Sequence, residues 1–138
     1  MTVLTHEDGI NGEIIELNEG KVSRGNFGIA LDIGTTTLVM QLCNVETGEV
    51  VVEESDYNSQ ISCGDDIINR IIYASKNEGL ERLRSLVLKS INGMISRGVA
   101  QTGIDLESIS CIMVAGNTTM CHLFLGLEPK FIREEPYS

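Results

Sequence analysis

An aspartate, a glycine and three threonines stand together where this chain is best suited to chemistry, at Asp32, Gly34, Thr35, Thr36 and Thr37. One apolar run leads into this segment and a second follows it, which predicts a buried strand, a tight turn and a returning strand. A glycine lets the backbone approach a ligand closely, and threonine hydroxyls and turn N–H groups can donate to phosphate oxygens. A single carboxylate can hold Mg²⁺ through waters that the ion retains. The segment therefore predicts a magnesium–phosphate site. The alternative is an ordinary β-hairpin, although such hairpins usually turn at Asn-Gly or Asp-Gly.

A second segment with similar character contains Gly116, Asn117 and Thr118. It follows an apolar run and precedes a predicted short helix. The first N–H groups of a helix have no partner within the helix, so they form a site for an anion. The alternative is that Asn117 only caps the helix. His122, further along the same helix, is expected to be a packed or surface histidine rather than a base or a ligand.

The elements that must position these two segments follow the order β-β-β-α-α-β-α. Apolar runs predict strands at 28–33, 38–45, 50–56 and 110–114, and helical spacing predicts helices from about 65, over 80–102 and from 117 to 126. A helical crossover joins the third strand to the fourth. Such crossovers are right-handed, so the fourth strand should lie parallel to the first. Both polar segments then lie at the end of the sheet where open α/β sheets bind ligands.

The start of the first helix is marked by Asp65 and Asp66, whose charges suit a helix N-terminus. Asp66 can also pair with Arg70, four residues further on. The apolar face of this helix is expected to consist of four isoleucines, Ile67, Ile68, Ile71 and Ile72.

Composition limits the classes of protein to which this chain can belong. Its 138 residues are enough for one domain with a core, and 42% hydrophobic and 22% charged residues are typical of a globular protein. A net charge of −10 argues against a nucleic-acid partner. The sequence has neither a signal peptide nor an apolar run of the roughly 20 residues that span a bilayer. We therefore expect a cytoplasmic protein without a membrane partner.

The four cysteines, Cys43, Cys63, Cys111 and Cys121, form no CxxC pair. Cysteine in strands and helices usually packs as a small hydrophobe, so we expect buried, reduced thiols rather than disulfides or a metal site. Residues 1–26 are expected to be a linker or the remnant of an upstream segment, in which 14–17 and 21–22 could form a small hairpin. Residues 27–138 are expected to be the start of a larger domain.

Three motifs carry a resemblance to known families. Residues 28–37 resemble the first phosphate motif of the superfamily of acetate and sugar kinases, heat-shock ATPases and actin (ASKHA). Residues 114–129 are more discriminating, as is Asn58-Ser59-Gln60 followed by residues 64–71. These two motifs resemble the ATP-dependent reductive activators of corrinoid proteins. The resemblance covers about residues 27–138.

This resemblance implies a ribonuclease H-like (actin-like ATPase) half-lobe, with a mixed sheet and helices, that binds MgATP. Asp32 would hold Mg²⁺ through water. The β- and γ-phosphates would contact four residues of the first turn, Gly34, Thr35, Thr36 and Thr37. The phosphate cleft would be bordered from the fourth strand by Gly116, Asn117 and Thr118. In the family, ATP hydrolysis drives a closing motion that helps return cob(II)alamin to cob(I)alamin on a corrinoid protein.

Departures from the family pattern indicate a fragment of a larger activator. The activators also carry an N-terminal ferredoxin-like domain with a 2Fe-2S cluster, and a second lobe with the adenosine pocket; neither is expected in this sequence. Phosphoryl transfer needs groups on both sides of the γ-phosphate, so this chain alone should bind MgATP weakly and hydrolyse it negligibly. An incomplete sheet also leaves an open edge, which favours a homodimer. The implied partner is a corrinoid protein, either a corrinoid iron–sulfur protein or the corrinoid subunit of a methyltransferase.

Three alternatives remain at this point. The activator ATPases of 2-hydroxyacyl-CoA dehydratases or benzoyl-CoA reductases share this type of turn but need cysteines that hold a 4Fe-4S cluster. A non-catalytic interaction module could keep the half-fold without binding nucleotide. A sugar- or acid-kinase lobe is disfavoured because no catalytic acid stands beside a substrate-binding motif.

Overall fold

The computed structural model describes residues 2–7, 12–18 and 25–133. Its first two strands, β1 (Thr2–Glu7) and β2 (Gly12–Asn18), pair with each other in antiparallel orientation. The strand predicted at 14–17 is therefore present, but its partner is β1 on its N-terminal side. The other half of the predicted hairpin, residues 21–22, lies outside the described residues.

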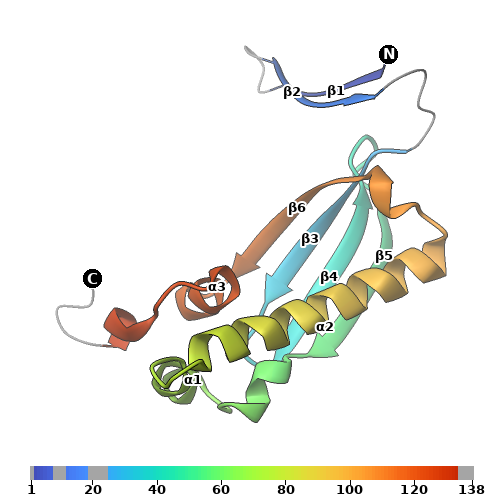
Figure 1. Cartoon of the computed structure of the whole chain (residues 1–138). Helices are drawn as coiled ribbons and strands as arrows, with labels where there is room; N and C mark the ends of the chain where they lie inside the picture. Colours follow the sequence, from blue (N-terminus) through green and yellow to red (C-terminus); the bar gives the residue numbers. More distant parts are fainter. Residues whose placement is uncertain (1, 8–11, 19–24, 134–138) are drawn as a thin grey trace.

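Four further strands form a mixed sheet in the order β5-β4-β3-β6 (Figure 1). They are β3 (Phe27–Ile33), β4 (Thr37–Asn44), β5 (Val50–Tyr57) and β6 (Ile109–Gly116). Hairpin neighbours β3, β4 and β5 are antiparallel, whereas β6 lies parallel to β3. The predicted order β-β-β-α-α-β-α and the parallel fourth strand are confirmed, since the chain crosses over through helices before it enters β6.

Helices cover one face of this sheet, and α2 runs along it (Figure 1). The α-helices are α1 (Ile67–Ala74), α2 (Gly79–Thr102) and α3 (Thr118–Leu125), and short 3-10 helices occupy Ser59–Ser62, Leu106–Ser108 and Lys130–Arg133. Alternate residues of the strands pack against the apolar faces of α2 and α3. This core includes Ile29, Leu31, Ile33, Leu38, Met40, Leu42, Leu83, Val87, Met94, Met120 and Leu123.

Helix ends follow the signals in the sequence. The Asp66 side chain caps α1 by accepting a hydrogen bond from the N–H of Asn69 at 2.7 Å. Gly103 and Gly126 end α2 and α3 with φ values of 70° and 74°, a left-handed conformation that glycine adopts without steric cost. The predicted apolar face of α1 is wrong in part, because Ile68 and Ile72 are exposed. In the described part of the chain, α1 contacts α2 and the 3-10 helix of Lys130–Arg133, and these contacts leave the two side chains largely uncovered.

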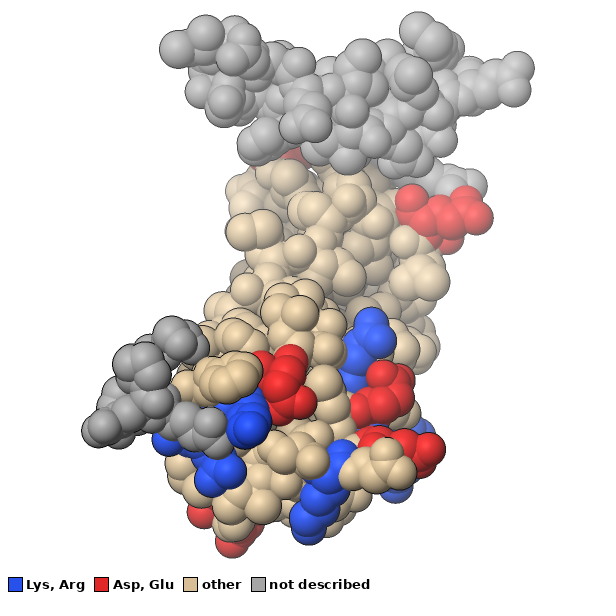
Figure 2. All heavy atoms as spheres, turned by 60° about the vertical axis from the view of Figure 1, so that its left-hand side comes forward, with Lys and Arg blue, Asp and Glu red and all other residues tan. Residues whose placement is uncertain are grey.

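Strand β6 is exposed along most of its length, on both of its faces. Ile112, Met113 and Val114 are 50%, 73% and 37% exposed, although their apolar character is typical of a buried strand. Figure 2, in which the side that carries β6 is turned forward, shows a largely uncharged surface across the middle of the molecule. Among the described strands only β3 pairs with β6, so its outer edge is open.

The cysteines differ from the expectation of buried thiols. All four are free, as expected, but Cys111 is exposed and the other three are half-buried. Cys111 is exposed because it lies on the exposed strand β6. Within residues 25–133 and the two N-terminal strands, no helix has the length and apolar character needed to cross a membrane.

Candidate phosphate site at the ends of β3 and β6

The two polar segments lie side by side at one end of the sheet, because β3 and β6 are parallel neighbours. The register pairs Asp32 with Ala115 and Ile33 with Gly116, so both strands end at the same level. The Asn117 Nδ2 atom donates to Thr35 Oγ1 at 3.4 Å, which links the segment after β6 directly to the turn after β3. The topology thus brings together residues that are 82 positions apart in the sequence.

The first turn, residues 34–37, is tightly closed. The N–H of Gly34 donates to the carbonyl of Thr37 at 3.0 Å, and a Cβ at Gly34 would stand 2.5 Å from that oxygen. Thr36 and Thr37 are exposed and Thr35 is half-buried. Asp32 is exposed on the face of the sheet that the helices leave open. A hydroxyl-rich turn beside an accessible carboxylate fits the predicted magnesium–phosphate site.

The second segment is the N-terminus of α3. Asn117 caps this helix, since its Oδ1 accepts from the N–H of Met120 at 3.0 Å. A Cβ at Gly116 would stand 3.0 Å from the carbonyl oxygen of Ile33, so glycine permits the close approach of the two strands here. Thr118 is exposed. Asn117 therefore performs the capping role considered as the alternative and, with its amide nitrogen, also contacts the first turn.

His122 is accounted for by its local contacts. Its Nδ1 lies 2.8 Å from the carbonyl oxygen of Thr118, one turn earlier in α3. The ring is half-buried on the helix. This agrees with the expectation of a packed histidine.

The turn after β3 is held from inside the protein by residues that were not predicted as site residues. Asn58 donates its side-chain Nδ2 to the carbonyl of Gly34 at 2.9 Å and its backbone N–H to the carbonyl of Thr36 at 2.8 Å. Arg70 donates its Nη2 to the carbonyl of Thr35 at 2.6 Å. Asn58 and Arg70 both belong to the motif of residues 58–60 and 64–71, one of the motifs that carried the family resemblance. The motif therefore marked these residues but did not indicate that they hold the turn.

Arg70 does not pair with Asp66 as the helical spacing suggested. Its guanidinium points into the protein, where Nε donates to the carbonyl of Gly64 at 2.8 Å, and its side chain is fully buried. Asp66 instead caps α1. Burial lowers the pKa of Arg70 from its usual value, because removal from water disfavours the charged form. The arginine nevertheless stays protonated at neutral pH, since its usual pKa is far above this range.

The described residues offer no site for an iron–sulfur cluster. No group of three or more His, Cys, Asp or Glu side chains in that part of the structure could hold a metal ion. A single carboxylate such as Asp32 can still hold Mg²⁺ with water and phosphate as further ligands.

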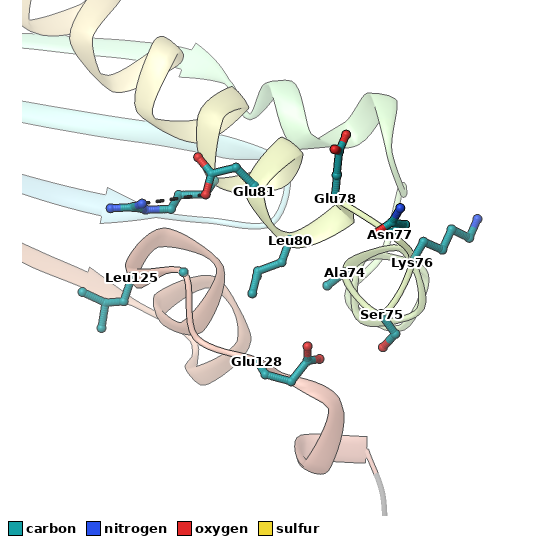
Figure 3. Close-up of a pocket in the computed structure, with 11 residues that line it drawn as sticks. Ala74, Ser75, Lys76, Asn77, Glu78, Leu80, Glu81, Leu125 and Glu128 are labelled. Atoms are coloured by element: carbon teal, nitrogen blue, oxygen red, sulfur yellow. Dashed lines mark ion pairs between the residues drawn. The ribbon is translucent and has the colours of Figure 1, made fainter.

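A separate surface pocket of about 610 Å³ lies between the end of α1, the start of α2 and the segment after α3 (Figure 3). Its charged lining includes Glu81, Glu128 and Arg84, and Arg84 lies 3.8 Å from Glu81. None of the predicted site residues lines this pocket. The candidate site is therefore the pair of turns rather than this hollow.

A mixed sheet with glycine-containing turns at the ends of two parallel strands defines an α/β domain of the kind that binds its ligands at these strand ends. The family described as the RACo middle region matches residues 27–138, and the chain belongs to that family. It is 36% identical over 112 residues to the corrinoid activation enzyme RamQ of Eubacterium limosum, an alignment that covers 80% of this chain and 19% of that protein.

A solved structure described as a reductive activator for a corrinoid, iron–sulfur protein has the same fold. It matches with a TM-score of 0.90 and 41% sequence identity over 97% of this chain and 22% of its own length. The predicted fold class and the predicted resemblance to corrinoid activators are thus confirmed. The chain spans about a fifth of the length of these relatives. The match decides in favour of corrinoid activators over the dehydratase activators and the sugar- or acid-kinase lobes.

Proposed function

We propose that residues 27–138 provide one half of the MgATP site of an ATP-dependent reductive activator of corrinoid proteins. One observation carries the proposal: Asn117 contacts Thr35, so two polar glycine turns meet at the ends of parallel strands. Family membership supports it, because the similar proteins are described as a corrinoid activation enzyme and a reductive activator.

Each predicted site residue has a role in this proposal. Asp32 would hold Mg²⁺ through water, since its carboxylate is exposed at the end of β3. The first turn would donate to the β- and γ-phosphates from the threonine hydroxyls and the N–H groups of residues 34–37. The free N–H groups at the start of α3, together with Gly116, Asn117 and Thr118, would border the phosphates from the other side.

The wider activity of the whole activator is also part of the proposal. ATP supplies the free energy for a closing motion, and a corrinoid protein is the partner whose cob(II)alamin is returned to cob(I)alamin. Residues 27–138 would contribute phosphate binding and orientation to this process. A 2Fe-2S cluster, if the full natural chain holds one, would lie outside the described residues, which offer no ligand set for it.

We also propose that the protein self-associates and that it is cytoplasmic. The open edge of β6 supports self-association into a homodimer through added strand pairing. A cytoplasmic location is supported by the four free cysteines, because disulfides are rare in reducing compartments.

Titration calorimetry of MgATP against the full natural chain tests the proposal. We expect saturable binding in the unsubstituted protein and a large loss of affinity in Asp32→Ala. The 138-residue chain alone is expected to bind weakly and to hydrolyse ATP negligibly. Robust ATP turnover by this short chain, abolished by Asp32→Ala, would refute the view that it is only half of the site. Absence of MgATP binding by the full chain would instead favour the non-catalytic interaction module.

A further inference from the structure

Three successive carbonyl groups of the first turn are bound from inside the protein. The carbonyls of Gly34 and Thr36 accept from Asn58, and the carbonyl of Thr35 accepts from Arg70. In the described part of the chain, the N–H groups of Thr35 and Thr36 donate no hydrogen bond to the protein. Carbonyls turned inward and N–H groups left without internal partners are the arrangement that backbone anion sites use.

Arg70 connects this turn to three other parts of the fold. Its Nη1 lies 3.3 Å from Gln60 Oε1 and 3.3 Å from Met120 Sδ, and its Nε donates to the carbonyl of Gly64. The 3-10 helix of Ser59–Ser62, helix α1 and helix α3 therefore meet at one guanidinium. Among the described residues, its hydrogen-bond acceptors are all neutral atoms, so the positive charge is not cancelled by a directly bonded carboxylate.

The charges around this guanidinium are few and lie at its rim. Burial has the largest influence on the pKa of Arg70 and lowers it, while the neighbouring Cys63, Asp66 and Asp65 raise this pKa by less. Both aspartates are exposed. A buried charge is screened by water far less than an exposed one, so its field reaches the turn beside it.

We propose that Arg70 is a positioning residue for phosphate binding. It fixes the Thr35 carbonyl inward, and its buried charge favours an anion on the outer side of the turn. This inference rests on the proposed function, because it assumes that the turn binds the phosphates of MgATP. Arg70 itself would contact neither Mg²⁺ nor phosphate in the proposed site, and would act through the turn.

The test compares MgATP with adenosine as ligands of the full natural chain. In Arg70→Met, which places an uncharged side chain of similar length at this position, we expect the Kd for MgATP to rise about tenfold or more, because the turn loses the charge-assisted hydrogen bond to the Thr35 carbonyl and the buried positive charge behind it. The Kd for adenosine, which lacks phosphates, should stay unchanged. If Arg70 had only a general structural role, the Kd values for MgATP and for adenosine would rise alike, and this result would overturn the inference.

Chemical rescue supplies a second readout. In Arg70→Ala, guanidinium at millimolar concentration, well below the denaturing range, should restore MgATP affinity by entering the vacated space. Urea has a similar shape but no charge and should fail to restore it. Equal rescue by urea would show that the charge is unimportant. If Arg70→Ala does not fold, the comparison of the two ligands in Arg70→Met still decides the question.

Arg97 offers a matched control. Its side chain is 48% exposed on α2 and pairs with Glu54 at 2.9 Å and Asp56 at 3.1 Å on β5. Arg97→Met removes the same charge from the surface and should leave both Kd values unchanged. If the unsubstituted chain binds no MgATP, the proposed function itself fails. If it binds MgATP and Arg70→Met binds equally well, only the role of Arg70 is wrong.

Discussion

The amide nitrogen of Asn117 donates to the hydroxyl oxygen of Thr35 at 3.4 Å, across the two turns of the candidate site. The same side chain caps α3 through its oxygen. Asn117 therefore sets where α3 begins, and it also holds this end of the helix close to the turn after β3. This double use explains why an asparagine at this position can serve both the fold and the site.

Replacement of Asn117 by Asp separates these two uses. Asp caps helices about as well as Asn, so the free energy of unfolding should change by less than about 0.5 kcal/mol. The new negative charge beside the proposed phosphate site should weaken MgATP binding by about tenfold, which corresponds to roughly 1–2 kcal/mol of repulsion. Calorimetric titration measures this change. Asn92→Asp, which adds the same charge at an exposed position of α2, should leave the affinity unchanged.

Asp32→Asn tests the proposed magnesium ligand. The exposed side chain should be replaceable with less than about 0.5 kcal/mol effect on stability. We expect the increase in ATP affinity that Mg²⁺ confers on the unsubstituted protein to disappear, while ATP binding without the metal is retained. Titrations with magnesium and with a chelator measure both quantities. Glu53→Gln on exposed β5 is the control, and a normal magnesium effect in Asp32→Asn would show that Asp32 is no ligand.

Gly34→Ala should destabilise the protein. The added Cβ would stand 2.5 Å from the carbonyl oxygen of Thr37, so the turn has to open, at a cost typical of overpacking, about 1–3 kcal/mol. Gly93→Ala has the opposite expected sign. Its Cβ would meet nothing closer than 3.6 Å, and alanine within a helix gains about 1 kcal/mol over glycine. Chemical denaturation of the two variants should show a lower and a higher midpoint, respectively; equal midpoints would contradict the close packing at the turn.

Met113→Lys tests association through β6. The 138-residue chain is expected to form dimers by pairing at the open edge of this strand, and a lysine on an edge strand opposes such pairing. Sedimentation over a wide range of protein concentration should show dimers that Met113→Lys removes. Val51→Lys, on β5 at the other edge of the sheet, should leave them intact. A clean monomer at all concentrations would disprove the association.

Local patterns were enough to predict most of the architecture. Apolar runs marked the four strands of the main sheet, and the ends of α2 and α3 coincide with Gly103 and Gly126. These features depend on contacts between residues close in sequence. Exposure was harder to predict: β6 reads as a buried strand, yet Ile112 and Met113 are exposed because only β3 packs beside it among the described residues.

Sequence alone marked the residues proposed to bind phosphate, because a carboxylate, a glycine and hydroxyls stand together at Asp32, Gly34 and Thr35. The predicted crossover into a strand parallel to the first also placed the two turns at one end of the sheet, as the pairing of β3 with β6 shows. Only the tertiary structure decided how the first turn is held. Helical spacing directed Arg70 toward Asp66, whereas packing buried its guanidinium beneath Thr35, since the carbonyls gathered there offer more hydrogen bonds than one exposed carboxylate.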